Sequence, residues 1–144
     1  MRALIQRVSS ASVLVDQKIV GAIDSGLLVY LGIDKDDAAE DIEPFVNRII
    51  NYRIFPDSED KMNLALSDVS GSLLIVSQFT LVANTKKGNR PSFSSAATSV
   101  HAFNLYNLFV VKASEKCKVQ TGLFGADMEV NLCNDGPVTF LLEH

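Results

Sequence analysis

A continuous apolar run from Leu27 to Ile33 is the feature that most restricts how this chain can fold. The run is short for a helix and typical of a strand that is buried on both faces. Such a strand lies inside a sheet that is covered on each side, so we expect it to be central. The chain has 144 residues, a length that normally forms one domain, and we predict a single domain over residues 1–144.

Other short segments predict further strands, most of them antiparallel to their neighbours. Residues 11–15 and 19–20 flank the turn residues 16–18, which favours a hairpin. The remaining short strands are expected at Tyr52–Phe55, Met62–Leu66, Met128–Cys133 and Val138–Leu142. The last two are separated by Asn134–Pro137, for which an ordinary hairpin turn is the simplest interpretation.

Two amphipathic helices are expected against this sheet. The first has apolar residues at the positions of a helical stripe: Ile42, Phe45, Val46, Ile49 and Ile50. Asp37 and Glu40 have the spacing of a capping box, whereas Pro44 requires that this helix begins late or kinks. The second helix is expected over Ala96–Ser114, and its predicted core residues are Val100, Phe103, Tyr106 and Val110. The predicted class is therefore α+β, with a curled, barrel-like, mostly antiparallel sheet and two main helices.

Composition disfavours several classes of function. The formal net charge of −4 argues against a protein that wraps duplex nucleic acid, so no DNA partner is expected, while local contact with nucleic acid stays open. Cys117 and Cys133 lack metal-binding spacing and are interpreted as small core residues in a reducing compartment. No apolar run approaches a length of about 18 residues, and Arg2 and Arg7 interrupt a leader-like start. We expect a cytoplasmic protein with no metal, no cofactor and no membrane partner.

A search for conventional catalytic groups is negative. His101 falls in the second predicted helix and His144 is the last residue, so neither suggests a Ser/His/Asp or Cys/His triad. No glycine-rich nucleotide-binding pattern follows a predicted strand. The acidic residues between Asp34 and Asp41 are explained by helix capping and solvation.

Three segments remain as candidates for function. In the strand-like stretch Leu73–Leu81, Ser77 and Gln78 place polar groups where a buried strand should have none, although cross-strand hydrogen bonds explain them equally well. The loop 86–93 concentrates three cations next to an aromatic ring, which suits the phosphates of a single-stranded end or an ordinary solvated surface. The third segment is 134–139, with its turn residues between two apolar strands.

Taken together, four segments resemble one enzyme family. They are S-Q-F-T-L at 77–81, K-K-G-N-R-P-S-F at 86–93, G-L-F-G-A-D-M at 122–128 and N-D-G-P-V-T at 134–139. In order and spacing they are similar to D-aminoacyl-tRNA deacylases, also called D-Tyr-tRNA deacylases. The likeness begins with M-R-A-L-I-Q-R-V at 1–8, includes R-I-F at 53–55 and K-M-N at 61–63, and covers essentially the whole chain.

The resemblance implies an activity and two partners. The family hydrolyses the ester that joins a D-amino acid to the terminal adenosine of tRNA, and it also removes misplaced glycine, without metal or cofactor. Its members are homodimers in which a Gly-cis-Pro pair of one subunit enters the pocket of the other and rejects L-amino acids. Gly136 and Pro137 match that pair. The expected partners are the tRNA acceptor end and a second copy of the chain.

The resemblance also implies a catalytic segment that comprises Ser77, Gln78, Phe79 and Thr80. Main-chain N–H groups around Ser77 to Phe79 are the expected oxyanion donors, with help from the 2′-OH of the terminal ribose. Thr80 is a possible nucleophile in the family, but the sequence offers no histidine or lysine to activate it. Gln78 is expected to orient the substrate or to brace the strand.

The remaining site residues concern the nucleic acid. Phe124 and Met128 are expected beside the terminal adenine, with core packing as the alternative. Lys86, Lys87 and Arg90 are expected at the phosphates of the acceptor end. Two other functions stay open, namely a general hydrolase of small esters with Thr80 or Ser77 as nucleophile, and a non-catalytic module that binds the tRNA end.

Overall fold

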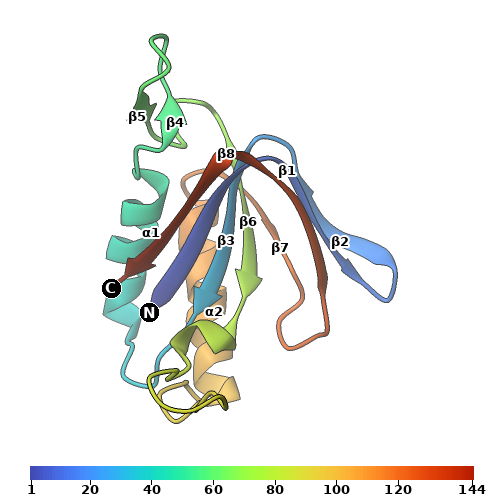
Figure 1. Cartoon of the computed structure of the whole chain (residues 1–144), viewed down its shortest axis with the longest axis vertical. Coiled ribbons are helices and arrows are strands. Elements are labelled where there is room, and N and C mark those ends of the chain that lie inside the picture. Colours follow the sequence, from blue (N-terminus) through green and yellow to red (C-terminus); the bar gives the residue numbers. More distant parts are fainter.

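The computed structural model describes residues 1–144, which form eight strands and two helices (Figure 1). Two short 3₁₀ turns, η1 and η2, accompany them. In chain order the elements are β1 (Arg2–Val15), β2 (Lys18–Ile23), β3 (Gly26–Gly32), η1 (Ala39–Asp41), α1 (Ile42–Ile50), β4 (Phe55–Pro56), β5 (Met62–Leu64), β6 (Ser72–Ser77), η2 (Phe79–Val82), α2 (Ser99–Ser114), β7 (Lys118–Thr121) and β8 (Glu129–Glu143).

The main sheet is curled and mostly antiparallel, as the sequence predicts. β3 is central, because it pairs with β1 on one side and, in parallel, with β6 on the other. β6 in turn pairs in parallel with β7, while β8 runs antiparallel along β1. In the strand order β2-β1-β3-β6-β7, the outermost strands β2 and β7 approach each other closely. A Cβ built on Gly21 would lie 2.3 Å from the carbonyl oxygen of Thr121. Glycine at this position therefore lets the sheet curl into a nearly closed barrel.

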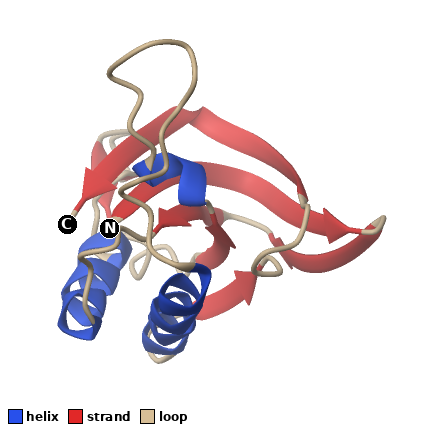
Figure 2. Cartoon of the chain, turned by 90° about the horizontal axis from the view of Figure 1, so that it is seen from below, coloured by secondary structure: helices blue, strands red, loops and turns tan.

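Both helices cover one face of the sheet and lie side by side (Figure 2). α1 buries the whole predicted stripe, namely Ile42, Phe45, Val46, Ile49 and Ile50. It contacts α2 through Phe45 and Phe109, whose ring centroids are 6.4 Å apart in an edge-to-face arrangement. A smaller apolar cluster fills the inside of the curl on the opposite face, formed by Val8, Ala11, Val13, Ile23, Leu28, Leu74 and Val76.

The beginning of α1 differs from the prediction in its capping. Asp37 and Glu40 form no capping box; Asp37 instead accepts hydrogen bonds from the N-terminal ammonium and from the N–H of Asp34. The carboxylate that caps η1 is that of Asp41, which accepts from the N–H of Ala38 at 2.9 Å. This hydrogen bond, together with the adjacent His144, lowers the pKa of Asp41. Pro44 is the third residue of α1, so the helix begins late enough for the proline to lie in its first turn.

The strand predicted over Leu73–Leu81 is too long. β6 ends at Ser77, and Phe79–Val82 form the 3₁₀ turn η2 after Gln78 leaves the extended conformation with φ −144° and ψ 83°. The polar pair Ser77 and Gln78 therefore marks the end of a strand, where both residues are only half-buried.

α2 is shorter than predicted and presents a different face to the core. It begins at Ser99, with the Thr98 side chain accepting a hydrogen bond from the N–H of His101 at 3.4 Å. Of the four predicted core residues, Val100 is 73% exposed and Phe103 is 47% exposed, and only Tyr106 is fully buried. The buried residues are Leu105, Tyr106, Phe109 and Ala113. The prediction for Val100 and Phe103 is wrong because this end of α2 leaves the core.

Three smaller predictions also need correction. Asn134–Pro137 form no hairpin turn: β8 runs through them as one strand, with register shifts opposite β1. Only Phe55 of the strand predicted at Tyr52–Phe55 is extended and paired, as part of β4. Cys133 is exposed and not a core residue, whereas Cys117 is half-buried, which raises its pKa.

No helix is long and apolar enough to cross a membrane.

Candidate active site

A cavity of about 550 Å³ opens between the end of β6, the beginning of α2 and the loop between β7 and β8. Most of its lining residues are apolar. They are Leu31, Ile33, Val76, Ser77, Gln78, Phe79, Ala96, Ala97, Ser99, Ala102, Tyr106, Phe124, Gly125, Ala126, Asp127, Met128 and Val130. The fold thus brings together two of the segments singled out from the sequence, 77–79 and 122–128, which are far apart along the chain.

Of the catalytic segment expected from the sequence, Ser77, Gln78 and Phe79 line this cavity. Gln78 donates its main-chain N–H to the carbonyl of Leu31 at 2.8 Å, which holds the segment against β3. The first hydrogen bond of η2 runs from the N–H of Leu81 to the carbonyl of Gln78, so the N–H groups of Phe79 and Thr80 have no acceptor inside the turn. Main-chain donors are therefore available at the end of β6.

Phe124 and Met128, from the loop between β7 and β8, also line the cavity. Phe124 lies between two rings of α2, with centroids 5.4 Å from Tyr106 and 5.3 Å from Phe103. A Cβ on Gly122 would lie 2.6 Å from the sulfur of Met128, so glycine at 122 makes room for this side chain. Tyr106 and Gly122 both donate to the carbonyl of Ile75, at 2.9 and 3.0 Å, which ties α2 and this loop to β6. Burial raises the pKa of Tyr106 to about 12, so its hydroxyl stays a neutral donor.

The cavity offers little acid–base chemistry. Asp127 is the only charged residue among those that line it, and no histidine, lysine or cysteine is present. His101 contacts the carbonyl oxygen of Asp37 at 2.9 Å, and His144 contacts Asp41 at 3.2 Å, so both histidines are engaged elsewhere. Thr80 does not line the cavity, and its hydroxyl accepts a hydrogen bond from the amide of Gln78 at 2.6 Å. No group that could deprotonate Thr80 contacts it.

The basic loop lies beside the cavity without lining it. Asn84 and Ser92 exchange main-chain hydrogen bonds of 2.8 and 3.0 Å, which close the loop below its tip. Lys86, Lys87 and Arg90 are all exposed on that loop. At its end, the ring of Phe93 contacts that of Phe79, which lines the cavity, with centroids 5.1 Å apart.

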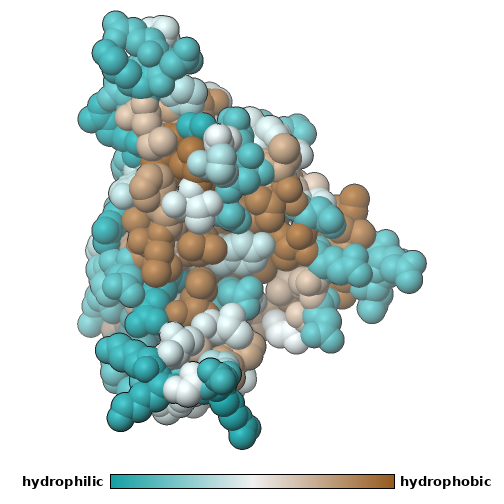
Figure 3. Space-filling model, viewed as in Figure 1, coloured by the Kyte–Doolittle hydropathy of each residue, from teal (hydrophilic) through white to brown (hydrophobic).

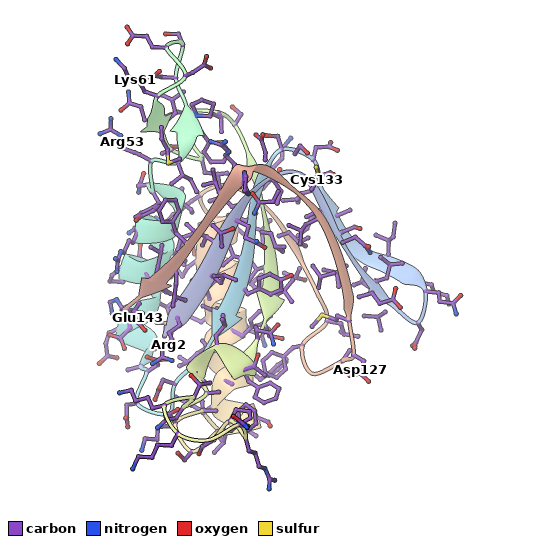
Figure 4. The ribbon with its side chains drawn as sticks, viewed as in Figure 1. Arg2, Arg53, Lys61, Asp127, Cys133 and Glu143 are labelled. Atoms are coloured by element: carbon purple, nitrogen blue, oxygen red, sulfur yellow. The ribbon has the colours of Figure 1, made fainter.

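Gly136 and Pro137 lie in the middle of β8, and neither lines the cavity of its own chain. Both are exposed, and the peptide bond between them is cis. Val130 of the cavity is six residues away along extended chain, up to about 20 Å. Figure 4 shows the same separation, with Cys133 at the top of the arch of β8 and Asp127 at the lower loop.

Arg7 anchors this exposed corner. Its guanidinium donates to the carbonyl of Asp135 at 2.8 Å and to that of Ile54 at 2.7 Å. The side chain is only 12% exposed. Arg7 was not among the residues expected in the site, but it stands at an inward position after Ala3 and Ile5, and a charge on the apolar face of a strand is a signal visible in the sequence.

The sequence did not reveal Ala96 and Ala97 of the loop before α2, or Ala102 in the first turns of α2, because alanine carries no chemical signal of its own. They enter the site through loop pairing, in which Ala97 donates to the carbonyl of Ile33 at 3.2 Å. Small side chains there leave the volume of the cavity open. Only the packing of α2 over the end of β3 reveals them.

Comparison with known proteins assigns the chain to a family. The sequence pattern described as D-Tyr-tRNA(Tyr) deacylase matches residues 4–143. The chain belongs to this deacylase family. It is 56% identical over 143 residues to a D-aminoacyl-tRNA deacylase of Pseudoalteromonas translucida, with 99% of each chain covered. It is 53% identical to the protein of the same name from a Sulfurihydrogenibium species, with 99% of this chain and 97% of that one covered.

Solved structures agree with this assignment of the fold. A structure titled c-Myc DNA Unwinding Element Binding Protein superposes with a TM-score of 0.95 at 38% identity, covering 100% of this chain and 99% of that one. A probable eukaryotic D-amino acid tRNA deacylase has a TM-score of 0.81 at 21% identity, covering 98% and 97% of the two chains, and supports the fold alone. The deacylase family consists of hydrolases that act on aminoacyl-tRNA ester bonds, so the cavity is the candidate active site of an enzyme.

Proposed function

We propose that this protein hydrolyses the ester bond of D-aminoacyl-tRNA and releases the free D-amino acid and tRNA. The observation that carries the proposal is the cavity that the segment 77–79 lines together with Phe124 and Met128. One wall offers main-chain donors and the other offers apolar and aromatic surface, which suits an ester joined to a nucleoside. A tRNA substrate places the reaction in the cytoplasm, where translation occurs.

The proposed chemistry uses positioning and main-chain donors. Water attacks the carbonyl carbon of the ester, N–H groups around Phe79 stabilise the resulting oxyanion, and the C–O bond to the ribose breaks. One well-placed donor contributes about 10²- to 10³-fold to such a step. The 2′-OH of the terminal ribose is the proposed proton relay, because no lining side chain is a conventional base. Gln78 orients the substrate and holds the hydroxyl of Thr80.

The nucleic acid is held by two further groups of residues in this proposal. Phe124 and Met128 contact the terminal adenine, since base–aromatic stacking contributes about 1–3 kcal/mol per base. Lys86, Lys87 and Arg90 contact the phosphates that precede it. The proposed phosphate contact is supported by the exposure of all three cations on a closed loop beside the cavity.

We further propose that selection against L-amino acids comes from a second copy of the chain. Gly136 and Pro137 are exposed and do not line the cavity of their own chain, which supports a role in the cavity of another subunit. A two-fold dimer satisfies this requirement twice, because each corner enters the partner's cavity. Figure 3 shows apolar surface between the two hydrophilic ends of the molecule, which is the surface such a dimer would cover. Main chain at the corner excludes an L side chain by its volume, whereas glycine has no side chain to exclude.

The decisive experiment compares D-Tyr-tRNA, L-Tyr-tRNA and Gly-tRNA as substrates at catalytic protein concentrations. We expect multiple turnovers on the D-ester and on the glycyl ester and no turnover on the L-ester. Equally fast hydrolysis of D-tyrosine ethyl ester would favour the general hydrolase instead. Binding of the tRNA end without turnover would favour the non-catalytic module.

The role of Thr80 is tested by Thr80→Ala. We expect kcat on D-Tyr-tRNA to fall less than about tenfold, because the variant removes a hydroxyl but leaves the main-chain donors in place. Thr80→Ser is the matched control, since it keeps the hydroxyl that Gln78 contacts. Loss of all turnover in the alanine variant, with tRNA binding and thermal unfolding unchanged, would make Thr80 the nucleophile.

A further inference from the structure

Two exposed phenylalanines stand at the mouth of the cavity. Phe79 is 60% exposed and Phe93 is 41% exposed, and their ring planes meet at 52° with centroids 5.1 Å apart. Neither ring belongs to the hydrophobic core. Apolar rings held together in water at the edge of a cavity are typical of a binding surface.

The charges around this ring pair identify the chemistry of its partner. Although the chain carries a net charge of −4, no aspartate or glutamate occurs between Asp68 and Glu115. Within that interval Lys86, Lys87 and Arg90 share one closed loop with Phe93, and none of the three forms an ion pair. Unpaired cations next to exposed aromatic rings are how proteins bind single-stranded nucleic acid, with the cations on phosphates and the rings under bases.

A second pair of rings near the cavity, Phe103 and Phe124, lacks neighbouring cations of this kind. Phe103 is 47% exposed and contacts Phe124 at 5.3 Å, so it also offers an aromatic face. The loop that carries Phe124 holds Asp127, whose carboxylate repels a phosphate. The distribution of charge therefore favours a nucleic acid on the side of Phe79 and Phe93.

We propose that Phe79 and Phe93 form a second nucleotide subsite, which stacks the base of the nucleotide that precedes the terminal adenosine. The proposal rests on the proposed function, because the first nucleotide occupies the cavity. An adenosine in the cavity has its 5′ phosphate at the mouth, where the next nucleotide begins. Phe79 then serves both ends of the substrate: its main chain lies at the ester and its ring contacts the second base. Because every base has an aromatic face, this subsite adds affinity without reading sequence.

The test uses esters of increasing length. The substrates are D-tyrosyl-adenosine, D-tyrosyl-cytidylyl-adenosine and the same dinucleotide with an abasic first nucleotide. In the native protein we expect the intact dinucleotide to have a kcat/KM about 5- to 150-fold higher than the abasic one, the range of base–aromatic stacking. Phe93→Ala should remove most of this difference through KM, while kcat/KM on D-tyrosyl-adenosine stays unchanged. Phe93→Trp should retain the difference.

Val100→Ala provides the matched control, because Val100 is an exposed apolar residue that does not line the cavity. It should leave kcat/KM on all three substrates unchanged.

The proposal is overturned if the native protein has the same kcat/KM on the intact and the abasic dinucleotide. It is also overturned if Phe93→Ala lowers kcat/KM on D-tyrosyl-adenosine as much as on the dinucleotide. A shift of Phe93→Ala from dimer to monomer in sedimentation, with the base effect retained, would make the rings a subunit contact instead. If the native protein hydrolyses no D-aminoacyl ester, tRNA included, the proposed function itself fails.

Discussion

The two helices have similar apolar content but different tasks. α1 has one apolar stripe, and all five residues of the stripe are buried. α2 buries Leu105, Phe109 and Ala113, places Ala102 and Tyr106 in the wall of the cavity, and leaves Val100 and Phe103 largely exposed. A helix that only closes a core thus has a single apolar face, whereas a helix that also borders a site carries apolar residues on more than one.

The largest expected effect is a loss of stability when the core contact between α1 and α2 is removed. Phe45→Ala removes a ring that is fully buried between α1 and α2. Its loss should lower the free energy of unfolding by about 3–5 kcal/mol through lost burial and the resulting cavity. Urea unfolding measures this loss, and kcat/KM at a temperature where the variant is folded should be close to native. A loss below about 1 kcal/mol would show that α1 is not fixed by this contact.

Tyr106 is both a buried residue of α2 and part of the wall of the cavity. We expect its variant to lose less stability than Phe45→Ala. Tyr106→Phe removes the hydroxyl that donates to Ile75, at a cost of about 1 kcal/mol, while Gly122 still donates to the same carbonyl. Burial raises the pKa of Tyr106 in the folded protein to about 12. The contribution of the neutral phenol to the free energy of unfolding is therefore fully present at pH values below its pKa in the unfolded chain, about 10. It is lost as the pH rises from about 10 to about 12.

Unfolding titrations of native protein and Tyr106→Phe at several pH values measure this contribution. The difference in unfolding free energy between them should stay constant up to about pH 10 and shrink above it. A difference that does not change with pH over that range would contradict the burial of the phenol.

The smallest effect on stability is expected at the exposed end of α2. Phe103→Ala should lower the free energy of unfolding by about 0.5–1 kcal/mol, because the side chain is 47% exposed and the ring contact it loses is the one with Phe124. It should nevertheless raise the KM for a D-aminoacyl-adenosine ester about two- to tenfold, since Phe124 loses the ring that holds it. Steady-state kinetics with Val100→Ala as control measure this. An unchanged KM would show that Tyr106 alone positions Phe124.

A site residue could be predicted from the sequence only where its local pattern differed from that of an ordinary core or surface residue. Ser77 and Gln78 were recognisable because polar residues interrupt an apolar strand, and that interruption proved to be the end of β6. Ala96, Ala97 and Ala102 were not recognisable, because alanine in a helix or loop is equally compatible with core, surface and site. Arg7 was overlooked although its position on the buried face of β1 carried a signal.

The corner of β8 was the most misleading segment for local reasoning. Asn134, Asp135, Gly136 and Pro137 have the chemistry of a turn, and in isolation they predict a hairpin. In the structure β1 pairs with β8 on both sides of them, and Arg7 holds the carbonyl of Asp135. The partner strand therefore overrides the local preference and keeps one long strand.

By itself the sequence determined the α+β class, the central strand Leu27–Ile33, the helix Ile42–Ile50 and the family, because these depend on periodicities and motifs within short stretches of chain. Only the tertiary structure decided that Ser77 to Phe79 line one cavity together with Phe124 and Met128 and that Gly136 and Pro137 do not line it. It also decided which residues of α2 face the core. The physical reason is that these relations arise from packing between segments distant in sequence, and no local pattern of polarity encodes which surfaces will meet.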